Sequence, residues 1–270
     1  MYAAGAPSYY ILVNIAALGV GSLAAWLIGR APSHNPPGAG IFTVAVAIVL
    51  LGTALLGPRV DGASRWIQIG GISLQPSLML LPRVVVLFAR IPDWPSSIGL
   101  LLIGIALALQ PDRAMAGTLT IALAVLRFYR SSAPLTLSLA AASVGFVLTL
   151  LRRDDVPPAP FVEHVVQSAF AFHPLAGVAT VAALVAMLLP ALVGMMTQKD
   201  GSAEFAVFSA TWLGVIASAL VGNYPTPMVG YGSSGIVGYC LSAALLGRRR
   251  EVNQLYPCRS EQPASVGISE

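Results

Sequence analysis

The sequence predicts an all-α protein that crosses a membrane many times as a bundle of helices. The chain has 270 residues, of which 56% are hydrophobic and only 10% are charged. A soluble globular protein usually has about 25% charged residues, so this chain lacks the charge that a surface in water needs. Apolar runs of about 20 residues recur along the chain, which is the length that a helix needs to cross a bilayer.

Eight of these runs are predicted to span the membrane. The last run, 229–247, makes nine if it crosses fully, and we adopt nine. They cover residues 9–29, 40–57, 76–91, 96–110, 114–129, 133–151, 174–196, 204–222 and 229–247. The first run lacks a basic leader and is long enough to span, so we expect a retained helix rather than a signal peptide. Residues 1–250 are expected to form one membrane domain, and the polar residues 251–270 a disordered tail.

The distribution of basic residues predicts the orientation in the membrane, because Lys and Arg concentrate in cytoplasmic loops. With nine crossings, nine basic residues fall on one side and five on the other. The richer side holds Arg30, Arg90, Arg127, Arg130, Lys199, Arg248, Arg249, Arg250 and Arg259, and the poorer side Arg59, Arg65, Arg113, Arg152 and Arg153. The C-terminus is therefore expected in the cytoplasm and the N-terminus outside.

Several common functions find no support in the sequence. The positive charges are scattered, so nucleic-acid binding is not indicated. Cys240 and Cys258 form neither a metal motif nor a disulfide framework. His164 and His173 are a weak metal signal, and a satisfied or interfacial histidine is favoured. The pattern G-x-G-x-x-G at 230–235 and its variant at 19–24 resemble a dinucleotide-binding motif, which needs a preceding strand. Both lie in membrane runs instead, where small residues allow close helix packing. No metal or cofactor is identified.

Polar motifs stand at the ends of the predicted spans on the outer side, so they should share one face. The sequence letters DGASRWIQIGGISLQPS occupy 61–77, and Gln110-Pro111-Asp112 ends the fourth run. Gln167-Ser168 precedes the seventh run, and 223–227 follows the eighth.

These motifs together resemble those of the SEDS family, the FtsW/RodA-type proteins of shape, elongation, division and sporulation. Gly62 to Ile67, Gly70 and Gln75-Pro76-Ser77 resemble the family's GA-x-RWI…LG…QPSE signature. Gln110 to Asp112 with Gly117-Thr118 resembles its QPD(L)GT loop, and Gln167-Ser168 its QS. Residues 225–234 resemble its P-x-P-x-x-S-Y-G-G-S signature.

The resemblance implies a ten-helix protein of the bacterial inner membrane, with a lipid-binding groove, that polymerises lipid II into peptidoglycan. It also implies a class B penicillin-binding protein as partner, beside the lipid bilayer and the lipid-linked precursor. Three departures stand out. The first family helix is absent, Leu78 stands where the family has Glu, and the outer loop with the family's catalytic Asp is missing before residue 174.

The expected substrate groove combines the motif residues with two arginines. A guanidinium can grip phosphate with two hydrogen bonds, so Arg65 is either a phosphate ligand or an interfacial anchor. Arg83 lies within a span, where a charge usually marks a functional or paired position, and is the preferred phosphate contact. The predicted groove consists of Arg65, Trp66, Gln75, Pro76, Ser77, Arg83, Gln110, Pro111, Gln167, Ser168, Pro225, Pro227, Tyr231, Gly232 and Ser233.

No catalytic residue can be assigned, although glycosyl transfer needs a base. The outer-face carboxylates are Asp61, Asp112, Asp154, Asp155 and Glu163. Asp155 and Asp112 are weak candidates for this base. We favour instead a solvated loop for Asp154-Asp155 and a helix-capping role for Asp112.

Three functional hypotheses follow. The first is a protein of cell division or cell shape that binds the lipid-linked precursor without polymerase chemistry. The second is an active glycosyltransferase with a substitute carboxylate, and the third a transporter of the precursor. The missing loop favours the first.

Overall fold

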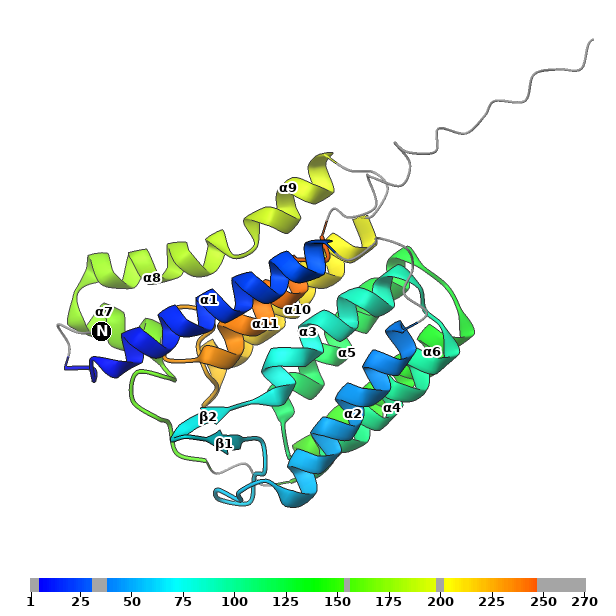
Figure 1. Cartoon of the computed structure of the whole chain (residues 1–270), viewed down its shortest axis with the longest axis horizontal. Helices are drawn as coiled ribbons and strands as arrows, with labels where there is room; N and C mark the ends of the chain where they lie inside the picture. Colours follow the sequence, from blue (N-terminus) through cyan, green and yellow to red (C-terminus); the bar gives the residue numbers. More distant parts are fainter. Residues whose placement is uncertain (1–4, 31–37, 153–155, 198–201, 247–270) are drawn as a thin grey trace, which may run out of the picture.

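Helices form nearly all the regular structure in the described part of the chain, which comprises residues 5–30, 38–152, 156–197 and 202–246 of a computed structural model (Figure 1). The helices are α1 (Tyr9–Arg30), α2 (Ala39–Leu56), α3 (Pro76–Arg90), α4 (Trp94–Leu109), α5 (Arg113–Tyr129), α6 (Ala133–Leu150), α7 (Val165–Phe172), α8 (Pro174–Ala186), α9 (Leu189–Thr197), α10 (Ser202–Val221) and α11 (Ser233–Ala243). Two short strands, β1 (Ile67–Ile69) and β2 (Ile72–Leu74), form a hairpin between α2 and α3.

The predicted membrane-helix class is confirmed. In the described part of the chain, five helical segments are long and apolar enough to cross a membrane: α1, α2, α6, the segment 174–197 and α10. The helix α4 is apolar but shorter. Large hydrophobic side chains such as Leu12, Ile15 and Trp26 are exposed along α1, where lipid would cover them.

The predicted and observed boundaries agree to within about two residues for the first six runs and the eighth. The other two runs differ. The seventh is broken into α8 and α9 near Met187 and Leu188, with Pro190 in the first turn of α9, where proline is tolerated. The ninth contains α11, whose 11 residues rise about 16 Å at 1.5 Å each, short of a bilayer's hydrocarbon layer. Among the described residues, the number of long spans is therefore lower than nine.

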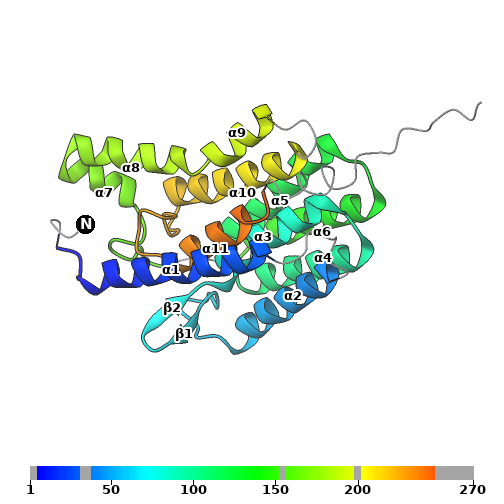
Figure 2. The ribbon, with the colours of Figure 1, turned by 45° about the horizontal axis from the view of Figure 1, so that its top comes forward.

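The helix α3 lies at the centre of the bundle. Most of its side chains are buried, from Ser77 to Ala89, and it packs against α2, α5, α10 and α11. Beyond these, α4 packs on α2 and on α6, while α1 lies along α11 (Figure 2). The helix α8 lies at the border of the bundle in both views and packs on α7.

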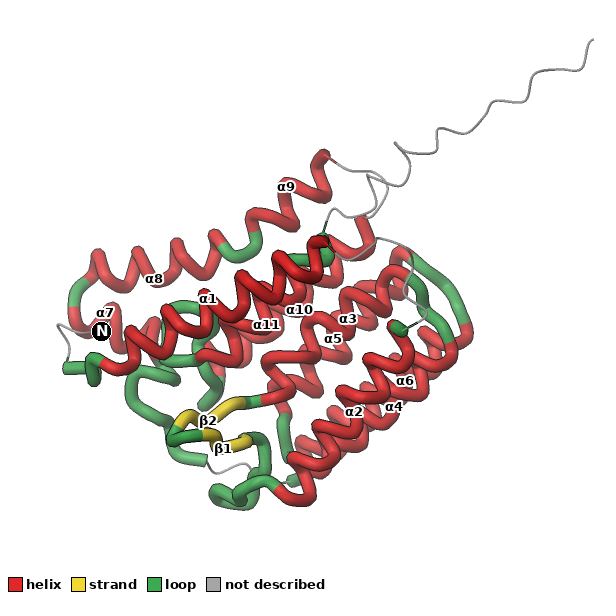
Figure 3. Tube along the Cα trace, in the orientation of Figure 1, coloured by secondary structure: helices red, strands yellow, loops and turns green. Residues whose placement is uncertain are grey.

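The two ends of the bundle are each held by contacts between loops that are distant in sequence. At one end, the backbone N–H of Thr226 donates to the carbonyl oxygen of Val162 at 2.9 Å. The hairpin lies at this same end (Figure 3). At the opposite end, Arg130 donates to the Arg90 carbonyl oxygen at 2.8 Å, and Arg90 donates to that of Leu245. The structure therefore places motif loops together at one end of the bundle.

A glycine of α11 packs directly on the backbone of α3. Pro82 has no N–H, so the carbonyl of Leu78 loses its usual hydrogen-bond donor within the helix. Gly238 lies against this carbonyl: a Cβ at residue 238 would be 2.4 Å from the Leu78 oxygen. Since no real Cβ approaches an oxygen so closely, only glycine lets α11 lie this near to α3.

The replacement Gly238→Ala should push α11 away from α3 and destabilise the protein by about 1–3 kcal/mol, the usual effect of overpacking. The measurement is the melting temperature of the purified protein in detergent. The matched control is Gly52→Ala in α2, because a Cβ at Gly52 would meet nothing within 4 Å. Equal melting temperatures for the two variants would contradict this packing.

Candidate functional site

The hairpin brings two of the predicted motifs next to each other. Ile67 pairs with Leu74 in antiparallel register, so Trp66 and Gln75 lie at the two open ends of the ribbon. The turn is Gly70-Gly71, both with positive φ, which a two-residue hairpin turn of type I′ requires. The sequence analysis missed this hairpin, although two glycines between alternating isoleucines are a recognisable signal for it.

The centre of the site is the carboxylate of Asp112, which is fully buried. Its Oδ2 accepts hydrogen bonds from Ser77 Oγ at 2.8 Å and from Gln75 Nε2 at 3.1 Å. Its Oδ1 accepts the backbone N–H of Met115 at 3.2 Å and so caps α5. We call Gln75, Ser77, Asp112 and Tyr224 the polar hub, because they connect three of the four sequence motifs.

Three helices begin at the polar hub. Gln75 is the N-cap residue of α3 and Asp112 that of α5. Ser234, in the first turn of α11, accepts the backbone N–H of Gln75 through its Oγ at 2.8 Å. A helix N-terminus has a partial positive charge, so the ends of α3 and α5 favour a negative group between them. This explains how a carboxylate can be buried here with neutral hydrogen-bond donors around it.

The fourth member of the hub is Tyr224, in the loop after α10. Its hydroxyl accepts a hydrogen bond from Gln75 Nε2 at 2.9 Å. Burial, and then the nearby negative charge of Asp112, raise the pKa of the Tyr224 phenol well above its ordinary value. The phenol therefore stays protonated and neutral through the physiological range.

Arg65 is enclosed by protein rather than extended to the membrane surface. Only 3% of its surface is exposed, and its Nη2 donates to the carbonyl oxygen of Pro111 at 2.8 Å. Its guanidinium carbon lies 5.8 Å from the ring centroid of Trp66. The interpretation of Arg65 as a snorkelled anchor is therefore wrong, because its head group lies inside the fold.

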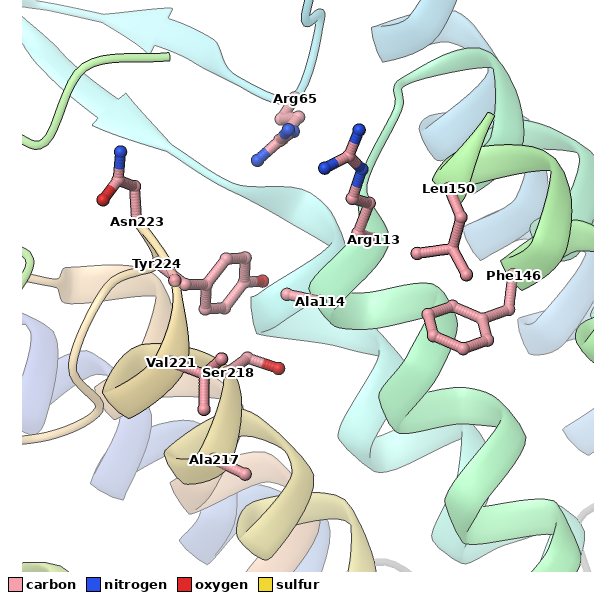
Figure 4. Close-up of a pocket in the computed structure, with 11 residues that line it drawn as sticks. Arg65, Arg113, Ala114, Phe146, Leu150, Ala217, Ser218, Val221, Asn223 and Tyr224 are labelled. Carbon is pink, nitrogen blue, oxygen red and sulfur yellow. The ribbon is translucent and has the colours of Figure 1, made fainter. Parts of the chain in front are cut away.

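A cavity of about 550 Å³ lies on one side of the hub (Figure 4). Arg65 and Arg113 lie at one end of it, and apolar side chains of α6 and α10 form its walls. The wall residues include Phe146, Leu150, Ala217 and Val221. Leu150 and Val221 are also exposed on the outside of the bundle, so the apolar wall continues onto the lipid-facing surface. We call this space the arginine cavity.

A second cavity, of about 350 Å³, has a different lining. It includes Trp66, Gln75, Pro225, Tyr231, Gly232 and Ser233 from the predicted groove, together with Glu163. We call it the Glu163 cavity. Trp66 and Pro225 line it, whereas their chain neighbours Arg65 and Tyr224 line the arginine cavity. The two cavities thus lie on either side of these two residue pairs.

The remaining predicted groove residues have varied positions. Pro76 is buried at the start of α3, and Gln110 donates to the Leu50 carbonyl oxygen at 2.7 Å, linking α4 to α2. Pro227 lies in the loop before α11, close to Gly235. Gln167 and Ser168 are exposed on α7 and are absent from the described lining of both cavities.

Arg83 is not part of the hub. Its guanidinium lies 5.2 Å from the ring centroid of Phe42, near the start of α2, and Nη1 donates to the Leu241 carbonyl oxygen at 3.4 Å. These partners belong to the half of the bundle away from the motif loops. A role of Arg83 in phosphate binding stays a prediction.

The two weak catalytic candidates differ in what the structure says of them. Asp112 caps α5, as favoured from the sequence, and has no exposed surface from which to reach a substrate. Asp155 lies outside the described residues. The histidines have structural partners: His164 Nε2 lies 2.8 Å from Asn223 Oδ1, and His173 caps α8. The useful residues that sequence reasoning did not select are Arg113, Glu163 and Tyr224.

Removal of the Gln75 amide should destabilise the protein, because it leaves Asp112 and Tyr224 short of a donor in a buried place. We expect Gln75→Leu to cost about 1–3 kcal/mol, the range for an unsatisfied buried group. The measurement is thermal unfolding in detergent. Gln167→Leu is the control, because that side chain is exposed and its hydrogen bond to the Leu220 carbonyl oxygen, at 3.3 Å, should contribute little in water. A Gln75→Leu variant as stable as the wild type would show that the hub is not a stabilising network.

Comparison with known proteins identifies the family. The family model of the FtsW/RodA/SpoVE cell cycle proteins matches residues 2–155, more than half of the chain. No curated protein matches the sequence.

Solved structures match the fold over nearly the whole chain. The rod shape determining protein RodA of Thermus thermophilus aligns with a TM-score of 0.58 and 19% identity, over 91% of this chain and 89% of that one. An Asp-to-Ala mutant of that RodA aligns with the same TM-score and identity, over 91% of this chain and 90% of the mutant chain. A chain from a peptidoglycan synthase complex that coordinates polymerization and crosslinking aligns with a TM-score of 0.57 and 21% identity, over 90% of each chain. This chain is a multi-pass membrane protein with a RodA-like fold, and it belongs to the FtsW/RodA/SpoVE family of cell cycle proteins.

Proposed function

We propose that this protein binds a lipid-linked peptidoglycan precursor, lipid II, at its outer face and lacks the polymerase chemistry of its relatives. The observation that carries the proposal is the arginine cavity, where two arginines lie above an apolar wall. Lipid II combines a diphosphate with a polyprenyl chain. Guanidinium groups suit the diphosphate, and an apolar wall that continues to the lipid-facing surface suits the chain.

The two arginines are held ready for such a ligand by different contacts. Arg65 is fixed to the Pro111 carbonyl oxygen, and Arg113 Nε donates to that of Thr149 at 3.2 Å. Arg113 also donates through Nη2 to the carbonyl of Arg152. These hydrogen bonds to carbonyl oxygens position two guanidinium groups at the cavity, and a guanidinium suits phosphate. Positioned cations bind more strongly than mobile ones, since less side-chain entropy is lost on binding.

The junction between α7 and α8 supports the absence of polymerase chemistry. The helix α7 ends at Phe172 and α8 begins at Pro174, so only His173 lies between them. The outer loop in which the family resemblance implies a catalytic Asp has no counterpart there. Asp112 is enclosed and bonded, so it cannot serve as the replacement without breaking the hub. The chain would then hold the precursor for a partner, such as a class B penicillin-binding protein.

Arg113→Gln should weaken lipid II binding about tenfold, because a hydrogen bond to a charged group contributes about 1.5–3 kcal/mol. Binding is measured with the purified full-length protein in detergent. The control is Arg127→Gln, the same charge change on the same helix but exposed near its other end. An unchanged affinity in Arg113→Gln, with wild-type binding intact, would contradict the assignment of the arginine cavity.

Polymerisation of lipid II separates the first functional hypothesis from the second. We expect no glycan strands from the wild-type protein, with or without a class B penicillin-binding protein, while binding persists. Strands that disappear on Asp155→Asn would show instead that an active site has been rebuilt on the remaining loops.

We further propose that the C-terminus is cytoplasmic and that the membrane is the bacterial inner membrane. Arg90 and Arg130 lie together with Leu245 at the end of the bundle away from the motif loops. A C-terminal green fluorescent protein should therefore fluoresce in cells, and a C-terminal alkaline phosphatase should be inactive. The reverse pattern would invert the whole topology and place the motif loops in the cytoplasm.

A further inference from the structure

The arginine cavity joins a charged end to a largely apolar space between three helices. Among the described residues that line it, Arg65 and Arg113 are the only charged ones. Phe146 of α6 and Ala217 of α10 lie on opposite sides of the space, with Ala114 of α5 between them (Figure 4). The cavity therefore leads from two guanidinium groups into a space that α5, α6 and α10 enclose on three sides.

The helix α5 holds the two walls of this space apart. Both α6 and α10 pack along α5, and they pack on each other far less. The Phe146 ring lies on Gly117, where a Cβ would be 3.1 Å from it. On the other side, a Cβ at Gly214 would be 2.9 Å from Thr118 Oγ1, so α10 also lies close to α5. Both walls are thus fixed by packing on α5, and the space between them is preformed, as in most ligand sites.

An exposed apolar surface continues from the cavity along α5 and α10. Ile121 follows Ala114 by two helical turns, so both lie on one face of α5, and the Ile121 side chain is 50% exposed. Phe128 lies two turns farther along the same face and is 89% exposed. On α10, Leu213 lies one turn from Ala217 and is 50% exposed. We call Ile121, Phe128 and Leu213 the apolar strip, which leads from the cavity toward the opposite end of the bundle.

An apolar surface within a membrane needs a reason to hold one chain rather than any other. A lipid chain gains little from apolarity alone there, because it exchanges contacts with other chains for contacts with protein, and packing decides the outcome. A prenyl chain has such a reason if its diphosphate is bound at the arginines. Its first units are then held at a high effective concentration beside the apolar space, so their binding becomes an intramolecular step.

We propose that the first isoprene units of the lipid-linked precursor lie in the arginine cavity between α6 and α10, and that the apolar strip carries the following units along α5. The inference rests on the proposed function and adds the path of the prenyl chain. Ala217 decides whether the chain fits, because it is a small residue in the α10 wall opposite Phe146. Ala217 and Ile121 are binding residues here and perform no chemical step.

The first test measures lipid II binding to the full-length protein in lipid nanodiscs. Ala217→Trp should lower the affinity about tenfold, because the larger ring occupies the space of the chain. The variant should fold, since Ala217 is exposed. Ala140→Trp is the matched control and should leave the affinity unchanged, because it makes the same change at an exposed residue of α6 outside the described cavity lining.

Inorganic diphosphate, which has no chain, separates the two parts of the ligand. It should compete with lipid II, and its own affinity should be equal for the wild type and Ala217→Trp. A lower affinity for inorganic diphosphate in the variant would show that the new ring blocks the arginines, and would overturn the inference. If Ala217→Trp binds lipid II as the wild type does while Arg113→Gln weakens it, the chain path is wrong and the arginine cavity stands.

A second variant tests the apolar strip with a shorter chain. Ile121 is exposed, so Ile121→Trp should fold, weaken lipid II several-fold and leave the affinity for farnesyl diphosphate unchanged, because that chain ends within the cavity. An unchanged affinity for lipid II would show that the strip carries ordinary membrane lipid instead. Failure of the wild type to bind lipid II, or of inorganic diphosphate to compete with it, would overturn the proposed function itself.

Discussion

The buried carboxylate of Asp112 is the group on which the motif-loop end of this protein depends. Ser77 and Gln75 donate to it from the start of α3, and the N–H of Met115 donates to it from α5. A buried charge without such donors would cost several kcal/mol, so these contacts fix where both helices begin. Tyr224 and Ser234 join through Gln75, which adds α10 and α11 to the same point. Four helices are thus positioned by one negative group.

The two cavities beside the hub differ in character over a short distance. Adjacent residues in the chain face different spaces: Arg65 and Tyr224 line the arginine cavity, while Trp66 and Pro225 line the Glu163 cavity. Gln75, at the end of the hairpin, is hydrogen-bonded to Tyr224 in the loop after α10 and to Ser234 in α11. Positive charge and apolar wall are kept on one side, and carboxylate and aromatic rings on the other.

The sequence predicted the helices well, because membrane spans depend on composition over long windows and turn residues mark their ends. It also predicted that the motif loops share one end of the bundle. Apart from the Asp112 cap of α5, it did not predict contacts made by single side chains. Glu163 was known as an outer carboxylate, but only the pairing of its loop with that of Tyr231 puts it beside Trp66. Arg83 was expected near the motifs and lies instead toward Phe42, because its direction is set by helix rotation that a sequence pattern does not resolve.

The junction of α7 and α8 has a consequence for how the fold can vary. His173 is exposed, and its backbone N–H still closes the last turn of α7 while its ring caps α8. The Phe170 ring packs on Gly177, so the two helices hold each other without help from the hub. Exposed junctions between two helices that pack on each other are sites where insertions are tolerated. The junction is therefore a position at which an inserted loop is expected to leave α3, α5 and α11 in place.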